Sequence, residues 1–546
     1  MTYSVSVIVG AAACLYVLWL ALHEFFVRSP LDNVKGPPSP SVFVGHIIDF
    51  FQSEGGNFAK RMAETYGHVV KLRGLFGARM VLTHDSRVLH TVLIKDADAF
   101  PKCAAPYDEF MLLLGPGVFT TESAQHRRQR KQLNPVFSVA HLRRMTDIFY
   151  RIGYRACEAI QRRVGSFPDG ALVDVNGWIG RMTLEMLGQA GLGYSFDNFV
   201  DDSTDAFGES VKSFFPTYSQ VALIGFVVPI MSYVMPRRLI ATIFRAIPHA
   251  ELRKMMHISD LMEQRSKEII TEKKMALMKG DDELKHNVGE GKDLMSILLR
   301  ANMLASAEEK LTDEELIAQM STFMLAGMDT TSNALTRALY VLSEHPEEQE
   351  RLREEVTEAR NGDDLTYDAL DKLPYLDAVC RETLRLYPPV AAIARGVAKD
   401  MTLPLHTPVI GVDGTVIQEL HVSAGQWMLL NLQASNCDPV LWGEDALQWK
   451  PERWLEPLPT ALEDARIPGV YSNLMTFSGG SRSCIGFKFS QLEMKVLLSL
   501  LISSFKFEAT GQPVDWKYSA VSYPTMGEES TKPELLLRVT RVQQHR

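Results

Sequence analysis

The sequence predicts a large, mainly helical domain with a smaller β portion, and three observations support this fold class. The chain has 546 residues, of which 46% are hydrophobic and 23% charged, so it can bury a large core. Glycine and proline are near their average frequency, which excludes a mainly disordered or fibrous chain. The apolar spacing is mostly helical, apart from an alternating stretch near the N-terminus and short strands expected between residues 401 and 470.

Charge and cysteine content exclude several classes of protein. The 57 basic and 66 acidic residues give a net charge of −9, whereas a general nucleic-acid binder needs a basic excess. The six cysteines form no C-x-x-C pair and no short spacing. This cysteine pattern argues against a disulfide scaffold or a zinc site and favours a reducing compartment.

Residues 1–28 are predicted to be an N-terminal membrane anchor. Val5 to Leu22 is a run of eighteen residues without charge, long enough for a transmembrane helix. No Lys or Arg precedes the run, while Arg28 and Lys35 follow it, so the positive-inside rule places the rest of the chain in the cytoplasm. The alternative is a cleaved secretory signal, but the basic n-region and an A-x-A cleavage site are both missing.

Residues 29–41 are expected to be a proline-rich hinge, followed by one large domain over residues 42–546. The segment Gly36-Pro37-Pro38-Ser39-Pro40 favours a stiff extended tether, although an ordinary loop has the same composition. Within the domain, alternation predicts two strands over residues 68–73 and 79–82. Glu272 to Lys292 is charged and contains glycine, which is typical of a surface loop.

Two further segments have distinct patterns. Val221 to Pro236 is strongly apolar but broken by glycine and proline, so it is either a surface that dips into a bilayer or a buried core segment. Leu311 to about Glu344 is predicted to be one long helix, with Thr312 and Glu315 as a capping box. Pro346 ends that helix and opens a charged one that stops at Asn361-Gly362.

The strongest chemical signal is the segment Phe477-Ser478-Gly479-Gly480-Ser481-Arg482-Ser483-Cys484-Ile485-Gly486. Glycines on both sides of Cys484 let the backbone wrap closely around a flat ligand, and amide N–H groups can point at the sulfur and stabilise a thiolate. Arg482 adds a positive charge, and a helix that starts near Gly486 adds its positive end. These features are those required of a thiolate ligand to an iron porphyrin, and the other five cysteines lack them.

This segment, F-x-x-G-x-R-x-C-x-G, resembles the haem-binding loop of the cytochrome P450 monooxygenases, and the resemblance extends from about residue 36 to the C-terminus. Alone, the remaining motifs would indicate only a helix with a tolerated glycine, a surface ion pair and a turn. The anchor and hinge are similar to those of microsomal and, from details of sequence, fungal members. The motifs that follow the family order are Ala326-Gly327-Met328-Asp329-Thr330-Thr331, Glu382-Thr383-Leu384-Arg385 and Pro451-Glu452-Arg453-Trp454.

The resemblance implies a role for each motif. Cys484 would be the axial thiolate of heme b, and Phe477 would lie in the cofactor-binding loop. In the long helix, Gly327 would leave room beside the porphyrin, and a Thr hydroxyl would take a backbone partner and open the helix locally. Thr330 would hydrogen-bond dioxygen while Asp329 relays protons.

Further residues are implied as structural or cofactor-binding. Glu382, Arg385 and Arg453 would form a buried triad that shapes the pocket, with Trp454 in place of the commoner Phe. The haem propionates need cationic and hydrogen-bonding partners. The residues implied for that purpose are Arg482, Arg395, Arg130 and His126, the last of which replaces the family's usual Trp.

The implied reaction is RH + O2 + 2 electrons + 2 protons → ROH + H2O. Electrons would come from NADPH–cytochrome P450 reductase, with cytochrome b5 as a further candidate donor, because the chain has no flavin or nicotinamide fingerprint. The enzyme would lie in the endoplasmic reticulum membrane as a single-pass protein with a cytoplasmic catalytic domain. Cations that could face a reductase are Arg127, Arg128, Arg130, Lys131, Arg143, Arg144 and Lys488.

The substrate is expected to be apolar, because the segments that line the pocket in this family are aliphatic and aromatic here. A terpenoid, sterol, fatty acyl chain or aromatic compound would fit, in secondary metabolism or xenobiotic oxidation. A haem-thiolate isomerase or dehydratase and a non-catalytic membrane haem protein are the alternatives, and the presence of Thr330 argues against both. The lining segments are Ala104–Phe119, Val221–Pro236, Val390–Ala394 and Tyr523–Met526.

Overall fold

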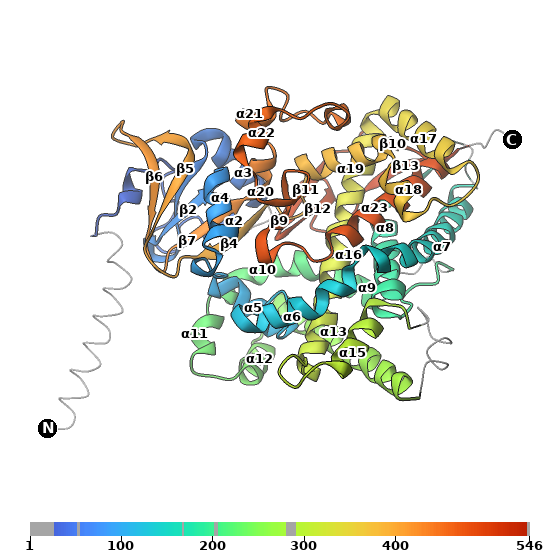
Figure 1. Ribbon diagram of the computed structural model, residues 1–546, viewed down its shortest axis with the longest axis horizontal. Coiled ribbons are helices and arrows are strands. Elements are labelled where there is room, and N and C mark those ends of the chain that lie inside the picture. Colours follow the sequence, from blue (N-terminus) through green and yellow to red (C-terminus); the bar gives the residue numbers. More distant parts are fainter. Residues whose placement is uncertain are drawn as a thin grey trace. The chain divides into compact units, whose positions relative to one another are not determined.

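A computed structural model describes residues 27–51, 55–165, 167, 169–200, 206–279 and 291–542 (Figure 1). The predicted anchor, Val5 to Leu22, lies outside the described residues, as does Cys14. Among the residues that are described, no helix combines the length and the apolar character needed to cross a bilayer. The described residues fold into two compact units with interleaved segments. Those within 1–103, 391–444 and 459–482 form the first unit, and those within 104–390, 445–458 and 483–546 form the second.

The first unit is built on a four-stranded sheet with the order β1-β2-β7-β4. The strands are β1 (Val69–Arg73), β2 (Arg79–Thr83), β7 (Trp427–Asn431) and β4 (Ala392–Gly396). β1 and β2 form an antiparallel hairpin, as predicted, and β2 then runs parallel to β7. All five residues of β2 are buried, as expected for an inner strand. Two hairpins complete the strands of this unit: β5 (Met401–Ile410) with β6 (Val416–Val422), and β8 (Gly469–Tyr471) with β9 (Leu474–Gly479).

Short helices flank this sheet. The four-residue turn η1 (Pro30–Asn33) carries a capping box in which Ser29 and Asp32 cap each other. Asp32 also pairs with Arg79, and the amide of Lys71 donates to the carbonyl of Lys35, so the start of the expected tether is packed on the β1–β2 hairpin. The α-helices of the first unit are α2 (Ile47–Phe51), α3 (Gly55–Tyr66), α4 (Ser86–His90), α20 (Leu432–Asn436), α21 (Pro439–Trp442) and α22 (Thr460–Ala465).

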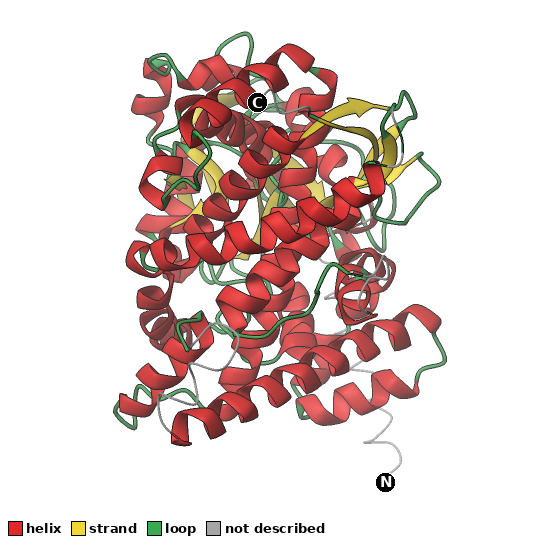
Figure 2. Cartoon of the chain, turned by 90° about the vertical axis from the view of Figure 1, so that its right-hand side faces the viewer, coloured by secondary structure: helices red, strands yellow, loops and turns green. Residues whose placement is uncertain are grey.

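The second unit is mainly helical and is organised around the long helix α16 (Asp313–Glu344). Helices predominate over strands in the cartoon of the chain (Figure 2). Thr312 and Glu315 form the predicted capping box, and the next helix, α17 (Pro346–Arg360), ends at Asn361 in the left-handed conformation. The expected fold class, mainly helical with a smaller β portion, is confirmed for the part of the chain that is described. The other long helices of this unit are α7 (Val139–Val164), α13 (Ala250–Lys279), α19 (Pro374–Leu386) and α23 (Phe487–Ser504).

The shorter elements of the second unit include two small sheets, β10-β13-β3 and β11-β12. Their strands are β3 (Ala171–Asp174), β10 (Phe505–Ala509), β11 (Val514–Ser519), β12 (Val521–Met526) and β13 (Leu536–Arg541). The remaining α-helices are α5 (Ala104–Leu114), α6 (Ser123–Leu133), α8 (Val175–Met186), α9 (Ala206–Lys212), α10 (Phe214–Gly225), α11 (Val228–Ser232), α12 (Arg237–Ala246), α15 (Leu294–Leu304) and α18 (Tyr367–Asp371). A π-helical turn, η6 (Leu187–Leu192), continues α8.

One predicted loop is partly wrong. Residues 272–279 belong to α13 instead of a surface loop. The charge pattern predicted a surface loop, but Lys273 is 4% exposed and points inward. Its ammonium donates to Asp293 at 2.8 Å and to Ser296 at 2.9 Å. A buried, paired lysine is rare enough that charged sequence is normally assigned to the surface.

Candidate active site

The cysteine loop follows β9 and leads into α23. Gly480 has a positive φ of 70°, and a Cβ at this position would lie 2.0 Å from the carbonyl oxygen of Leu93. A Cβ at Gly479 would lie 2.1 Å from the carbonyl oxygen of Pro468. Both glycines are therefore required by close backbone contacts inside the first unit. This steric constraint differs from the clearance for a ligand that was expected from the sequence.

Cys484 lies just before α23, whose N-cap residue is Gly486. The amide of Gly486 donates to the sulfur and the Arg130 guanidinium lies near it; both lower the pKa of the thiol, while burial, the larger effect, raises it. Arg130 also donates from Nη1 to the carbonyl of Ser483 at 2.6 Å. The residue as a whole is nevertheless exposed, unlike the buried Cys157 and Cys380. Cys484 is thus an exposed cysteine whose thiol has a cation and an amide donor beside it.

One face of α16 is open in the middle of a buried helix. Ala326 is exposed and Thr330 is half-buried, one turn apart, while Leu325, Met328 and Thr331 are buried. The Thr330 hydroxyl donates to the carbonyl of Ala326 at 2.7 Å. The hydroxyl thus takes a backbone acceptor as expected, but the helix continues through this point as α-helix, so the expected local opening is not observed.

Gly327 has a different role from the one expected. A Cβ at Gly327 would lie 3.0 Å from a methyl carbon of Leu187 in η6. The missing side chain therefore points at Leu187, because successive helical residues are about 100° apart and only Ala326 and Thr330 share the open face. Gly327 permits close packing between α16 and η6, and the open face is made by its neighbours.

Asp329 points away from the open face and is 4% exposed. Burial raises the pKa of its carboxyl to about 7, and the ammonium of Lys212 in α9 opposes that rise. Lys212 donates to the carbonyl of Asn176 at 2.9 Å, and burial lowers its own pKa while Asp174 and Asp329 raise it. An acid with a pKa near neutrality can both release and accept a proton at physiological pH.

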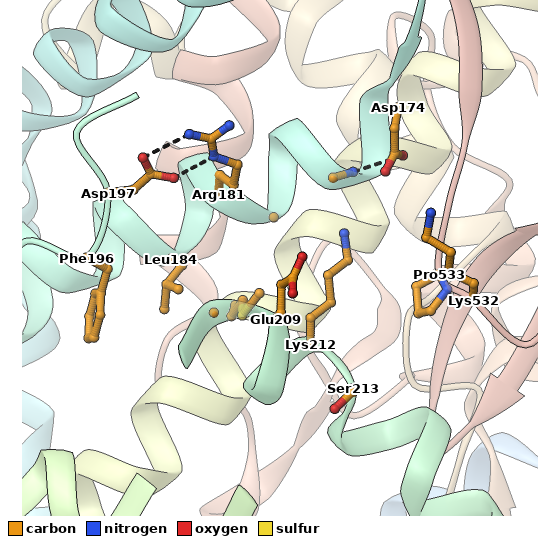
Figure 3. Close-up of a pocket in the computed structure, with 14 residues that line it drawn as sticks. Asp174, Arg181, Leu184, Phe196, Asp197, Glu209, Lys212, Ser213, Lys532 and Pro533 are labelled. Carbon is orange, nitrogen blue, oxygen red and sulfur yellow. Dashed lines mark hydrogen bonds and ion pairs between the residues drawn. The ribbon is translucent and has the colours of Figure 1, made fainter. Parts of the chain in front are cut away.

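A pocket of about 330 Å³ is lined by Lys212 and by other residues of α8, α9 and the turn before β13 (Figure 3). Glu209 and Lys212 project into it from α9, and Lys532 reaches it from the opposite side. Met328, the neighbour of Asp329, also lines it. Polar and charged groups therefore line a pocket that reaches Met328, the residue next to the buried Asp329 of α16.

The triad expected from the sequence is assembled in the second unit. Glu382 and Arg385 are fully buried and joined by two hydrogen bonds of 2.8 Å. Arg453 approaches Glu382 at 3.4 Å and also binds Asp445 at 2.7 Å. Trp454 donates from its indole N–H to Glu382 at 3.0 Å, so the departure from Phe adds a hydrogen bond. Buried charges tolerate burial only when paired and hydrogen-bonded in this way.

The remaining expected cofactor ligands fall in both units. Arg395, on β4 of the first unit, is buried. Its Nη1 donates to the carbonyl of Ala394 at 2.9 Å, and it makes no ion pair among the described residues. Phe477, on β9, packs edge-to-face against Tyr471, and Arg482 follows it in the same unit. His126 is buried on α6 of the second unit, one turn before Arg130.

Comparison with known proteins decides the family. Residues 35–525 match the family model described as Cytochrome P450. The chain is 55% identical over 539 residues to ganoderic acid synthetase of Ganoderma lucidum, covering 98% of both chains. It is 46% identical over 529 residues to cytochrome P450 monooxygenase 91 of Postia placenta, covering 97% of both.

The chain is a cytochrome P450. It is a haem-thiolate monooxygenase, and as a P450 it uses O2 and an electron-transfer partner. When bound, the haem supplies the chemistry that activates dioxygen, and the thiolate pushes electron density toward the iron, which favours O–O cleavage.

The residues of this P450 fit that cofactor. The sulfur of the exposed Cys484 is the ligand type required, and a coordinated thiol is deprotonated outright even though burial raises its pKa in the free chain. The buried guanidinium of Arg395 is a donor suited to a propionate. On α16, Thr330 presents a hydroxyl on the open face and Asp329 holds a proton behind it. A hydroxyl and a carboxyl so placed could hold and pass a proton, which remains the role implied by the sequence motif.

Three residues near this P450 site were missed by the sequence reasoning. Trp454 was judged only as an aromatic replacement, although its N–H group was available as a signal. Lys212 lies in an ordinary amphipathic helix, and nothing in the sequence links it to Asp329. Glu109, on α5, is 5% exposed, and the adjacent acids Asp108 and Glu109 inside the otherwise apolar run Ala104–Phe119 were the signal that could have found it.

Proposed function

We propose that this P450 oxidises a large apolar substrate of the terpenoid type in secondary metabolism, with the substrate held against an aromatic cluster of α5 and α10. Phe110 is the centre of that cluster. Its ring lies 5.1 Å from Tyr218, 5.2 Å from Phe119 and 6.3 Å from Phe214, measured between ring centroids. Aromatic rings supply a large, rigid apolar surface, which suits a polycyclic hydrocarbon.

Glu109 gives this apolar wall one polar group. Burial raises the pKa of its carboxyl to about 8, although a hydrogen bond with Tyr218 opposes the rise. At neutral pH the group is therefore mostly a protonated acid, which can donate one hydrogen bond and accept others. Such a group recognises a hydroxyl or carbonyl at one end of an otherwise apolar molecule, and it fixes the orientation of the substrate.

The comparisons support the same substrate class. A relative that shares 55% of its residues with this chain over nearly the whole length is named for the synthesis of ganoderic acid. A more distant relative, a P450 monooxygenase of Hericium erinaceus, shares 32% over 535 residues. The aromatic cluster is the observation on which the proposal depends. The name of the Ganoderma lucidum relative then narrows the proposed substrate class to terpenoids.

We infer that the enzyme is attached to the endoplasmic reticulum membrane. The run from Val5 to Leu22 supports a single-pass anchor on sequence grounds. Within the described residues, the segment around α11 exposes Ile230, Tyr233 and Val234 at 72%, 95% and 74%. An exposed apolar segment of this size suits contact with lipid, so it favours the bilayer alternative for Val221 to Pro236.

The electron donor is proposed to be a membrane-bound NADPH–cytochrome P450 reductase, with cytochrome b5 as a possible second donor. Several cations expected to face it are paired within the chain: Arg128 with Glu315, Lys131 with Glu309, and Arg143 with Asp368. Paired charges attract an acidic partner less strongly than free ones. Arg144 is exposed and has no ion pair among the described residues, so we place Arg144 and Lys488 at the centre of the docking surface.

The experiment is co-expression with a reductase and feeding of a panel of terpenoids, sterols, fatty acids and aromatic compounds. We expect a terpenoid product that is heavier by one oxygen, detected by mass spectrometry and absent without the reductase. Glu109→Gln should alter the position of oxidation or the affinity for substrates that carry a hydroxyl group, more than for the corresponding hydrocarbons. Turnover of fatty acids alone would contradict the terpenoid proposal.

A further inference from the structure

Three side chains with metal-binding atoms meet at one end of the four-stranded sheet of the first unit. In the β1–β2 hairpin, Val69 is the register partner of Thr83, so His68 and His84 face each other one position beyond the strands. The amide of His84 donates to the carbonyl of His68 at 3.2 Å, which extends the ladder to this pair. β7 runs parallel to β2, so the chain that leaves β7 reaches the same sheet end and brings Asp438 there.

The three side chains converge on one point. One ring nitrogen of each histidine and one carboxylate oxygen of Asp438 all lie within 4.8 Å of one another. His68 Nε2 is 2.8 Å from Asp438 Oδ2, and the two imidazole rings have centroids 4.6 Å apart and are tilted by 30°. Opposed cross-strand positions bring side chains close at any hairpin, but two histidines and a carboxylate at one such point form a set of metal ligands.

His84 is the observation that an ordinary ion pair does not explain. Its side chain is 93% buried, yet its ring makes no hydrogen bond within the residues that the structure describes. Buried imidazoles normally find a partner, because a buried polar group without one is unfavourable. An imidazole nitrogen that has no hydrogen-bond partner is available as a metal ligand.

The spacing suits a tetrahedral site. Zinc binds imidazole nitrogen and carboxylate oxygen at about 2.1 Å, which places neighbouring ligand atoms about 3.4 Å apart. His68 Nε2 and Asp438 Oδ2 are 2.8 Å apart, which is shorter than this value. The three ligand atoms all lie within 4.8 Å of one another, a limit that is longer than this value. The second carboxylate oxygen of Asp438 already accepts from the amide of Val440 at 3.0 Å, which fixes the orientation of the ligand from behind.

We propose that His68, His84 and Asp438 bind one zinc ion, with a water molecule as fourth ligand, and that this ion clamps the β1–β2 hairpin to the turn at α21. His68 and Asp438 are 370 residues apart in sequence, so the ion closes a very long loop within the first unit. Clips that close long loops stabilise a fold by restricting its unfolded chain. None of the three residues belongs to the haem site, so the clamp is a separate structural centre.

The test measures zinc and iron in the same sample of full-length, haem-loaded enzyme, purified with a tag that contains no histidine. We expect about one zinc per haem iron after dialysis, measured by elemental mass spectrometry, and one saturable site when zinc is titrated into chelator-treated enzyme. His84→Gln and Asp438→Asn should lower zinc affinity by about tenfold or more. Zinc should raise the unfolding temperature of the wild type but not of these variants.

The matched control is His421→Gln. His421 is also a cross-strand histidine, on the β5–β6 hairpin opposite Thr402, but it has no second histidine beside it, and its loss should leave zinc binding unchanged. Reduced-CO spectra of each variant show whether it has folded with haem. If the variants fail that check, X-ray absorption of the zinc-loaded wild type decides. A shell of nitrogen and oxygen with imidazole scattering supports the site, and sulfur scattering, absence of a saturable site or unchanged affinity in the variants overturns it.

Discussion

The indole N–H of Trp454 donates a 3.0 Å hydrogen bond to Oε2 of the buried Glu382. This carboxylate also accepts from two atoms of Arg385 and from the amide of Lys450 at 3.0 Å. Glu382 is therefore a negative charge without access to water, stabilised by converging donors. A Phe at position 454 would keep the aromatic contact and remove one donor.

Trp454→Phe should lower the free energy of unfolding by about 1.5 kcal/mol, because a hydrogen bond to a charged group contributes more than one between neutral groups. Trp449→Phe is the matched control, since Trp449 is also half-buried and donates to a neutral group, Thr383 Oγ1, at 3.1 Å. We expect about 0.5 kcal/mol there. Urea unfolding of both variants measures the difference, and equal losses would contradict a special role for the charged acceptor.

Cys484→Ala should abolish the red-shifted Soret band of the reduced CO complex, because that band requires a thiolate ligand. Cys157→Ala, which removes a buried cysteine of α7, should keep the band. Difference spectra of the two purified variants are the measurement. A persistent band in Cys484→Ala would show that another residue is the ligand.

Thr330→Ala should keep the CO spectrum but divert reducing equivalents from product to hydrogen peroxide, several-fold above the wild type. The reason is that Thr330 carries the hydroxyl on the open face of α16, where the sequence motif implies a hydrogen bond to dioxygen. Thr331→Ala is the control, since the adjacent Thr331 is buried and its hydroxyl donates to Ser490 at 3.1 Å. Peroxide and product are measured per NADPH consumed. Full coupling in Thr330→Ala would remove the proposed role.

Local signals in the sequence predicted the parts of the fold that depend on neighbouring residues. The capping box of Thr312 and Glu315 and the stop at Pro346 placed both ends of α16 to within two residues. The motif around Cys484 predicted the start of α23 at Gly486. These features are set by hydrogen bonds and backbone preferences over a few residues, which is why a single sequence shows them.

Features set by distant partners could not be predicted in this way. The direction of the missing side chain at Gly327 depends on Leu187, and the environment of Asp329 depends on Lys212. The burial of Lys273 in α13 depends on its ion pair with Asp293, the N-cap residue of α15. Each of these contacts joins residues from different elements, and no periodicity in the sequence reports such a pairing.

Glu109→Gln should stabilise the enzyme at neutral and alkaline pH. The pKa of Glu109 is raised to about 8, so folding favours the protonated acid, and the stability of the wild type is complete below about pH 4.5 and declines as pH rises toward 8. Glutamine does not titrate, so the advantage of the variant should grow over this range to at most about 5 kcal/mol and then level off. Urea midpoints at several pH values measure it. Glu309→Gln, at an exposed surface pair, should show no such trend.

Lys212→Met should move the alkaline limit of turnover to higher pH. Asp329, with a pKa of about 7, donates protons only while it is protonated, so a rate that depends on it falls as pH rises through that value. The Lys212 cation lowers this pKa, and its removal leaves burial unopposed, so the pKa rises and the fall shifts upward.

Other charges that act on Lys212 are Asp174, Lys532 and Glu534, and all remain in the variant. Lys212→Arg keeps a cation at the position and should retain the wild-type profile. Product formation at saturating substrate from pH 6 to pH 9 (roughly the span of the expected shift) distinguishes the two variants. Identical profiles in Lys212→Met and the wild type would mean that Asp329 does not limit proton delivery, because loss of the Lys212 cation removes the charge that lowers the pKa of Asp329.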